Sequence, residues 1–218
     1  MGIMSRRVRR RVAWVAAAAL VPLGAAVAPA AADAAEVSIN EIFYNASSAD
    51  PAFAGVEFLE VKNYGATDVD VSGWKFSAGI TIATPDLGLP AGTMIPAGGF
   101  LVGTSDPALF AAKYGFAADF SFAGTSLSNG GEQVTLVDAG AAVIDAVLYD
   151  DAAPWPVSPD GSGPSLEFNS DASDNALAAN WHASLAAFGS LRRRTPSRRC
   201  RWSSVRRRGI RRRVRIRC

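Results

Sequence analysis

The chain has 218 residues, of which 49% are hydrophobic, and its formal net charge is +2. That total hides three segments, because residues 1–35 hold five arginines, residues 191–218 hold fourteen, and residues 36–190 hold none. The middle segment has nineteen Asp and Glu against three Lys, a net charge of −16. Such a segment repels phosphate backbones, which disfavours nucleic-acid binding by it and leaves that option only to the arginine-rich end.

The first 35 residues have the order of a signal peptide. Their arginines precede an apolar run over residues 12–28, and Ala32-Asp33-Ala34 supplies a small-residue pattern for cleavage near Ala35. A membrane anchor is the alternative, but Pro22 and Gly24 interrupt the run. We therefore expect a secreted or cell-envelope protein with no transmembrane segment in its mature chain.

Residues 36–190 are expected to form one domain. A chain of this length buries about 70% of its unfolded surface, which is enough for a single core. Both cysteines, Cys200 and Cys218, lie beyond the domain. Packing and not disulfide bonds must therefore stabilise it, even in an oxidising compartment.

Alternation of apolar and polar residues predicts seven strands in this domain. The pattern is clearest over residues 74–82, where the even-numbered residues are apolar and are expected to share one face. The other six predicted strands cover residues 37–44, 56–64, 100–103, 133–137, 143–149 and 165–168.

A hairpin and a short helix are predicted among these strands. Residues 133–149, interrupted only at 138–142, favour a β-hairpin with a five-residue loop. Asp106 can cap a helix that begins at Pro107 and ends before Gly115. A weaker helical turn is expected over residues 176–179. Short strands with one small helix favour an all-β, two-sheet antiparallel sandwich.

The order and spacing of short sequence pieces resemble one known family. These pieces lie at residues 39–42, 57–63, 71–74, 95–102, 127–132, 143–149, 154–156 and 160–167 and at Trp181. Together they span nearly all of residues 37–185 and resemble the lamin tail domain, an immunoglobulin-like module of nuclear lamins that also occurs in exported bacterial proteins. The resemblance implies an immunoglobulin-like β-sandwich over residues 36–190.

Particular side chains have structural interpretations. Glu57 shares a predicted strand face with Leu59 and Val61, so its carboxylate is expected to be partly buried and to need N–H donors or a cation. We interpret it as a structural hydrogen-bond acceptor. The three tryptophans of the domain, Trp74, Trp155 and Trp181, are interpreted as core residues and not as ligand platforms.

The sequence provides little that indicates an enzyme. His182 is the only histidine, so a histidine metal cluster is excluded and any Ser-His-Asp arrangement would have to include it. We interpret His182 as a surface or packing residue. The neighbours Asp150 and Asp151 are expected to point into water and not to form a glycosidase pair. We therefore assign no catalytic residue, no cofactor and no enzymatic activity.

Weak calcium binding is the small-ligand hypothesis that stays open, because extracellular modules hold calcium with loop carboxylates and carbonyls. No EF-hand spacing is present, so no metal ligands are assigned. The segment at residues 160–163 is interpreted as a turn with positive φ angles, with a cation site as the alternative. The acidic loop residues are Asp150, Asp151, Asp160, Asp171 and Asp174.

Residues 191–218 are expected to be a disordered arginine-rich tail, for which two explanations stay open. The tail could bind nucleic acid, anionic lipid or cell-wall polymer, or clasp its own acidic domain. Alternatively, it is the product of a frameshift after about Ser190.

The functional hypothesis is a secreted, noncatalytic binding, adhesion or tethering module for an unidentified protein or polysaccharide of the extracellular space or cell envelope. The alternative is an accessory domain of an extracellular nuclease or phosphatase. Self-association through an exposed edge strand is a third, structural hypothesis.

Overall fold

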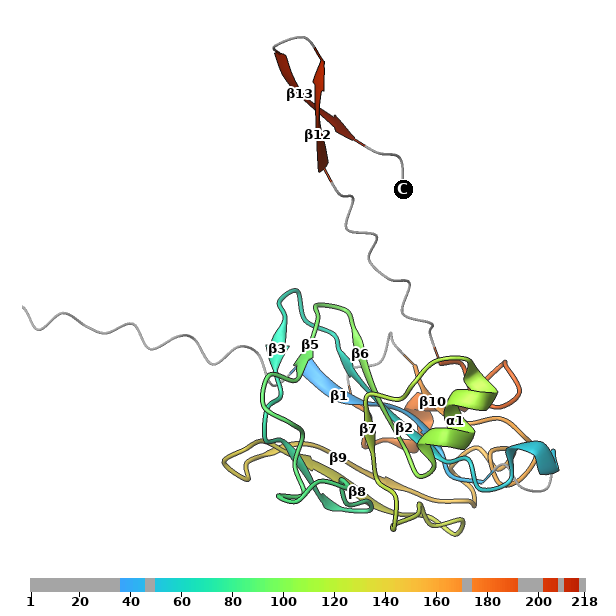
Figure 1. Ribbon diagram of the computed structural model, residues 1–218. Helices are drawn as coiled ribbons and strands as arrows, with labels where there is room; N and C mark the ends of the chain where they lie inside the picture. The colour runs from blue at the N-terminus through green and yellow to red at the C-terminus, as the bar shows by residue number, and fades with distance from the viewer. Residues whose placement is uncertain (1–35, 46–49, 170–173, 192–201, 208–209, 216–218) are drawn as a thin grey trace, which may run out of the picture. The chain divides into compact units, whose positions relative to one another are not determined.

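The computed structural model describes residues 36–45, 50–169 and 174–191, and the backbone of residues 202–207 and 210–215. Residues 36–191 form a two-layer β-sandwich with one short α-helix (Figure 1), which confirms the predicted fold class. The predicted signal peptide and both cysteines lie outside the described residues. Within the described part, no helix is long and apolar enough to span a bilayer.

The larger sheet has six strands in the order β11-β10-β1-β2-β6-β7. All its pairs are antiparallel except β6 with β7, so the expected wholly antiparallel pairing is wrong at this edge. The reason is that α1 lies between these two strands and returns the chain in the original direction. The bounds are β11 (Trp181–Ala183), β10 (Leu166–Phe168), β1 (Val37–Phe43), β2 (Phe58–Asn63), β6 (Phe100–Thr104), β7 (Phe120–Ser121) and α1 (Pro107–Tyr114).

The smaller sheet has the order β4-β8-β9. Its hairpin between β8 (Glu132–Val137) and β9 (Val143–Tyr149) has the predicted five-residue loop. β4 (Lys75–Ala78) is shorter than expected because Gly79 has a φ of +87° and turns the chain. Burial nevertheless alternates beyond the strand, since Ile80 and Ile82 are both buried.

Several very short elements escape the sequence pattern. β3 (Val69–Asp70) pairs with β5 (Met94–Ile95), β7 also has two residues, and β11 has three. Two or three residues are too few to show a period of two. A 3-10 helix, η2, covers Pro51–Phe53, and a second, η3, covers Ala178–Asn180, two residues later than the helical turn expected at 176–179.

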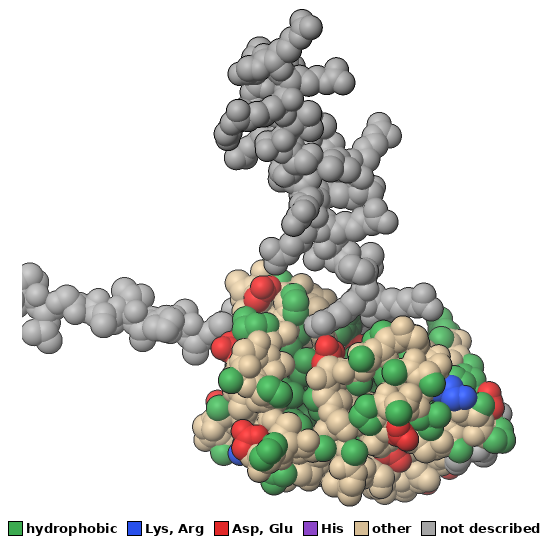
Figure 2. Space-filling view, viewed as in Figure 1, with side chains coloured by type: hydrophobic (Ala, Val, Ile, Leu, Met, Phe, Trp, Pro, Cys, Tyr) green, Lys and Arg blue, Asp and Glu red, His purple; other side chains and the backbone are tan. Residues whose placement is uncertain are grey.

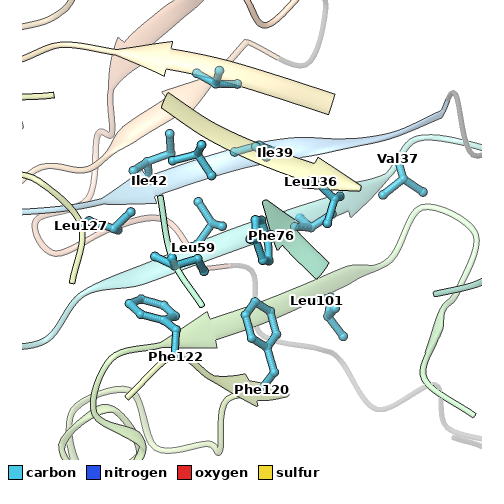
Figure 3. Close-up of a cluster of buried hydrophobic side chains, with 14 of the residues drawn as sticks. Val37, Ile39, Ile42, Leu59, Phe76, Leu101, Phe120, Phe122, Leu127 and Leu136 are labelled. Carbon is cyan, nitrogen blue, oxygen red and sulfur yellow. The ribbon is translucent and has the colours of Figure 1, made fainter. Parts of the chain in front are cut away.

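The core fills the space between the two sheets. Figure 3 shows Ile39 and Leu59 of the larger sheet directed toward Phe76 and Leu136 of the smaller one, with Phe122 completing the cluster. All five side chains are less than a tenth exposed. The same cluster contains Trp74, Trp155 and Trp181, which confirms that these tryptophans are core residues.

Helix α1 covers part of the outer face of the larger sheet. The Asp106 carboxylate accepts a hydrogen bond from the Leu109 N–H at 2.9 Å, and Gly115 ends the helix with a φ of 76°, so both predicted caps are confirmed. Phe110 packs edge-on against Phe58 of β2. A second, smaller core therefore lies under α1 on the face opposite to the main core.

The arginine-rich segment differs from the expectation of disorder, because part of it forms a hairpin. β12 (Trp202–Arg207) pairs antiparallel with β13 (Ile210–Arg215). The sequence favours strands here because β-branched residues recur among the arginines. Residues 192–201, 208–209 and 216–218 lie outside the described residues.

Candidate functional site

Three glutamates from neighbouring strands form a row across the outer face of the larger sheet. Glu41 of β1 is paired in register with Glu167 of β10 on one side and with Glu60 of β2 on the other. Glu167 is in turn paired with His182 of β11. We call the three glutamates the acidic row. Carboxyl groups on opposed strand positions repel one another, so their environment must offset this cost.

Glu41, the central member of the row, is fully buried and well supplied with donors. Its Oε1 accepts hydrogen bonds from the Ser165 hydroxyl and, at 2.7 Å, from the Ser190 N–H. Its Oε2 accepts from the Ser190 hydroxyl at 3.1 Å. Burial nevertheless raises the pKa of Glu41 to about 7, against the opposing effect of these bonds.

Glu60 is also buried, but only one of its two carboxyl oxygens has a hydrogen-bond partner among the described residues. Its Oε1 accepts a hydrogen bond from the Asn40 amide at 2.7 Å, and the Asn40 Oδ1 accepts one from the Tyr64 hydroxyl at 2.6 Å. Among the described residues, the second oxygen, Oε2, has no hydrogen-bond partner. Burial, reinforced by the charge of Glu41, raises the pKa of Glu60 to about 8. Glu60 is therefore largely protonated at neutral pH.

A bulge in β1 brings Asn40 to Glu60. The register of β1 against β2 shifts between Ile39 and Glu41, which leaves Asn40 as the extra residue. In a regular strand, the neighbours Asn40 and Glu41 would point to opposite faces. The bulge lets both contact groups on the outer face.

The acidic row lies beside a pocket of about 200 Å³, which we call the outer-face pocket. Glu167 and His182 form part of its wall, with the Glu167 Oε2 and His182 Nε2 3.6 Å apart. The side chain of His182 is 48% exposed, whereas that of Glu167 is 18% exposed. The lining residues are Asn40, Glu60, Lys62, Phe100, Glu167, Phe168, Asn169, His182 and Ser190.

Lys62 and two phenylalanines, Phe100 and Phe168, are among the lining residues, and Lys62 also contacts Tyr64 outside the lining. The Lys62 Nζ lies 3.9 Å from the centroid of the Tyr64 ring and 5.5 Å from that of the Phe100 ring. These distances are within the range of cation–π attraction. The pocket thus combines carboxyl groups, aromatic faces and one cation, which suits the binding of a polar or charged group.

Glu57 has the role predicted for it, at a different place in the domain. It is half-buried, and its Oε2 accepts a hydrogen bond from the Leu127 N–H at 2.8 Å. Burial raises the pKa of Glu57 to about 7. The interpretation as a structural acceptor is confirmed, and Glu57 does not line the outer-face pocket.

The acidic loop residues are only partly brought together. The Asp160 carboxylate accepts a hydrogen bond from the Asn45 amide at 2.7 Å, and hydrogen bonding with Asp150 raises the pKa of Asp151. Asp174 instead accepts from the Ala176 N–H, and Asp171 lies outside the described residues. In the part of the chain that the structure describes, no three His, Cys, Asp or Glu side chains are arranged to hold a metal ion.

The turn predicted at residues 160–163 is confirmed, because Gly161 and Gly163 have φ angles of 70° and 105°. These left-handed conformations cost little only for glycine.

Sequence reasoning missed the buried members of the acidic row. Glu60 lies two residues from Phe58 on β2, and Glu41 lies two residues from Phe43 on β1, so each glutamate shares a strand face with a phenylalanine. These phenylalanines on the outer face were the available signal, because they indicate that the face is covered. The cover comes from α1 and from the segment around Ser190, both distant in sequence, so the pattern of one strand could not reveal it.

Comparison with known families agrees with this architecture. A family model described as Lamin Tail Domain matches residues 30–151, more than half of the chain. The matched range contains the strands from β1 to β9, and therefore Glu41 and Glu60 but not Glu167 or His182. No curated protein matches the chain. The match confirms the resemblance seen in the sequence, and the chain belongs to the lamin tail domain family.

Proposed function

We propose that this protein is a noncatalytic binding module that acts outside the cytoplasm and uses the outer-face pocket as its binding site. The observation that carries the proposal is the Glu60 Oε2, which is buried beside the pocket without a hydrogen-bond partner among the described residues. An unsatisfied buried polar group costs about 1–3 kcal/mol. A ligand group that forms a hydrogen bond with this oxygen would remove that cost.

The charge of the domain supports a ligand that is not nucleic acid. Acidic side chains stand out on the face shown in Figure 2, where basic ones are few. The order of arginines, apolar residues and small residues over residues 1–35 supports export. A protein or polysaccharide of the extracellular space or cell envelope is the partner class that fits both features.

The carboxyl groups of the acidic row are held in place by neighbouring side chains. Glu41 is engaged by Ser165 and Ser190, and Glu60 by Asn40. His182 faces Glu167 at 3.6 Å, a contact that orients the imidazole at the surface. These contacts support recognition without bond chemistry.

Intact mass spectrometry of the protein secreted by its own host tests the export part of this proposal. We expect the mass to place the mature N-terminus near Ala35. Recovery only from the cytoplasm, with Met1 retained, would contradict it.

Cosedimentation of the mature full chain with isolated cell envelopes tests the binding part. The Glu167→Lys variant reverses a charge in the pocket wall and is expected to lower envelope binding about tenfold. The matched control is Asp86→Lys, the same charge reversal at an exposed loop residue outside the pocket. Equal binding by the two variants, both folded, would show that the pocket is not the binding site.

A further inference from the structure

We propose that the outer-face pocket binds the guanidinium group of an arginine side chain presented by a partner polypeptide. This inference rests on the proposed function and names the ligand class of the same pocket. The unpartnered Glu60 oxygen, the lining of the pocket and its size support this ligand.

The acidic row leaves acceptor capacity at two places. Glu41 is engaged through both oxygens by Ser165 and Ser190. Glu60 keeps one buried oxygen without a partner among the described residues, and Glu167 faces His182 only at the loose distance of 3.6 Å. A cation between Glu60 and Glu167 would be attracted by both and would relieve their mutual repulsion.

The wall of the pocket suits a flat cation. Phe100 and Phe168 line it, and aromatic rings attract cations to their faces. A guanidinium group is planar, is weakly hydrated and stacks on aromatic rings, and its fork of N–H donors matches carboxylate oxygens. An ammonium group offers neither the plane nor the fork.

The size of the pocket also fits. A space of about 200 Å³ has room for a guanidinium group and part of its stem. A bare metal ion fits less well, because the described residues contain no three-ligand group for one.

Binding of a cation should depend on pH because Glu60 must ionise to bind it well. The pKa of Glu60 is about 8, so affinity should rise roughly tenfold per pH unit below that value and level off above it. Protons are released on binding. The titratable and charged groups that face Glu60 and the rest of the acidic row come from several elements. They are Glu41 on β1, Lys62 on β2, Tyr64 directly after β2, Glu167 on β10, His182 on β11 and Tyr114 on α1.

Isothermal titration of the mature full chain with L-argininamide tests the proposal. L-citrullinamide is the matched ligand control, because it has nearly the same shape and the same free amine but an uncharged ureido group. We expect argininamide to bind on the order of a hundredfold tighter at about pH 8.5 than at about pH 6. We expect citrullinamide to bind at least about tenfold more weakly than argininamide at the higher pH.

Three variants locate the binding. Glu167→Gln is expected to weaken argininamide binding severalfold, whereas Asp86→Asn leaves it unchanged. Lys62→Met is expected to tighten it, because a competing positive charge is removed from the pocket wall. The thermal unfolding midpoint of each variant is measured alongside, so that loss of binding is not confused with loss of fold.

The outcomes separate this inference from the proposed function. Equal affinities for citrullinamide and argininamide would overturn the guanidinium assignment. An argininamide affinity that changes neither with pH nor in Glu167→Gln would also overturn it. If argininamide fails to bind while Glu167→Lys still releases the protein from envelopes, the pocket has another ligand and only this inference is wrong. If argininamide binds as expected but Glu167→Lys leaves envelope binding intact, the inference stands and the proposed function is wrong.

Discussion

The buried glutamates show how one residue type acquires different properties from its surroundings. Glu57 is half-buried and accepts one backbone N–H, whereas Glu41 is completely buried and accepts three hydrogen bonds. The pKa of each is about 7, because the additional donors of Glu41 offset its deeper burial. Glu60 has one donor and a pKa of about 8. Glu57 also has one donor, so what distinguishes Glu60 is its deeper burial and the neighbouring charge of Glu41.

Trp74 provides a stability prediction at the same scale. Its side chain is 5% exposed and belongs to the main core, so Trp74→Ala should lower the free energy of unfolding by about 3–5 kcal/mol. Leu185, which is fully exposed, is the control, and Leu185→Ala should change it by less than about 0.5 kcal/mol. Urea unfolding measures both. A loss below about 1 kcal/mol for Trp74→Ala would contradict its core position.

At the scale of elements, the β1 bulge links the two sheets as well as shaping the pocket. The Ile39 N–H donates to the Asp145 carboxylate of β9 at 2.6 Å, and the Asn175 amide bridges the Ile39 carbonyl and the same carboxylate. The backbone groups of Ile39 beside the bulge are thus satisfied by Asp145 of the smaller sheet and by Asn175, which lies between β10 and η3. The same irregularity serves both stability and the candidate site.

The adjacent glycines before β8 allow a matched test of how an element begins. A Cβ on Gly131 would lie 2.5 Å from the Tyr149 carbonyl oxygen, and Gly131 has a φ of +88°. A Cβ on Gly130 would meet nothing within 4 Å, and its φ is not in the left-handed range. Gly131→Ala should therefore destabilise the domain by about 2 kcal/mol or more, and Gly130→Ala by less than about 0.5 kcal/mol.

Thermal and urea unfolding of the two glycine variants check this expectation. Similar stabilities for both would show that the start of β8 does not approach β9 as closely as the structure indicates.

For the whole molecule, the raised pKa values of Glu41, Glu57 and Glu60 make stability depend on pH. These groups bind protons more tightly in the folded state than in the unfolded state, where the pKa is about 4.3. Their contribution is therefore complete below about pH 4.3 and is lost as the pH rises through 7 to 8. The domain should be more stable at about pH 5 than at about pH 8.5.

Thermal unfolding across this pH range measures the effect, and Glu60→Gln separates its causes. The variant cannot ionise at this position, so its unfolding midpoint should fall less between the two pH values than that of the unchanged protein. Added salt screens the surface repulsion expected from the charge of −16, but it does not remove the effect of burial on the pKa of Glu60. A midpoint that rises with pH would contradict the assigned pKa directions.

Local patterns in the sequence were enough to predict most of the sandwich. Period-two alternation located β1, β2, β6, β8 and β9, because each is long enough to expose a buried and an outer face. Capping chemistry located α1 through Asp106 and Gly115, because these residues act on neighbouring backbone groups. The spacing of the pieces around Trp74 and Trp155 indicated the lamin tail domain family, which the family match confirms.

The candidate site depended on tertiary structure. The sequence by itself determined that residues 36–190 are acidic, rich in strands and stabilised without cysteine. Only the folded chain decided that Glu41, Glu60 and Glu167 share one row, because residues more than a hundred positions apart meet there through strand register. Burial of Glu60 likewise depends on what covers the outer face. A carboxyl group's pKa is set by neighbours brought from distant parts of the chain, and no local pattern encodes them.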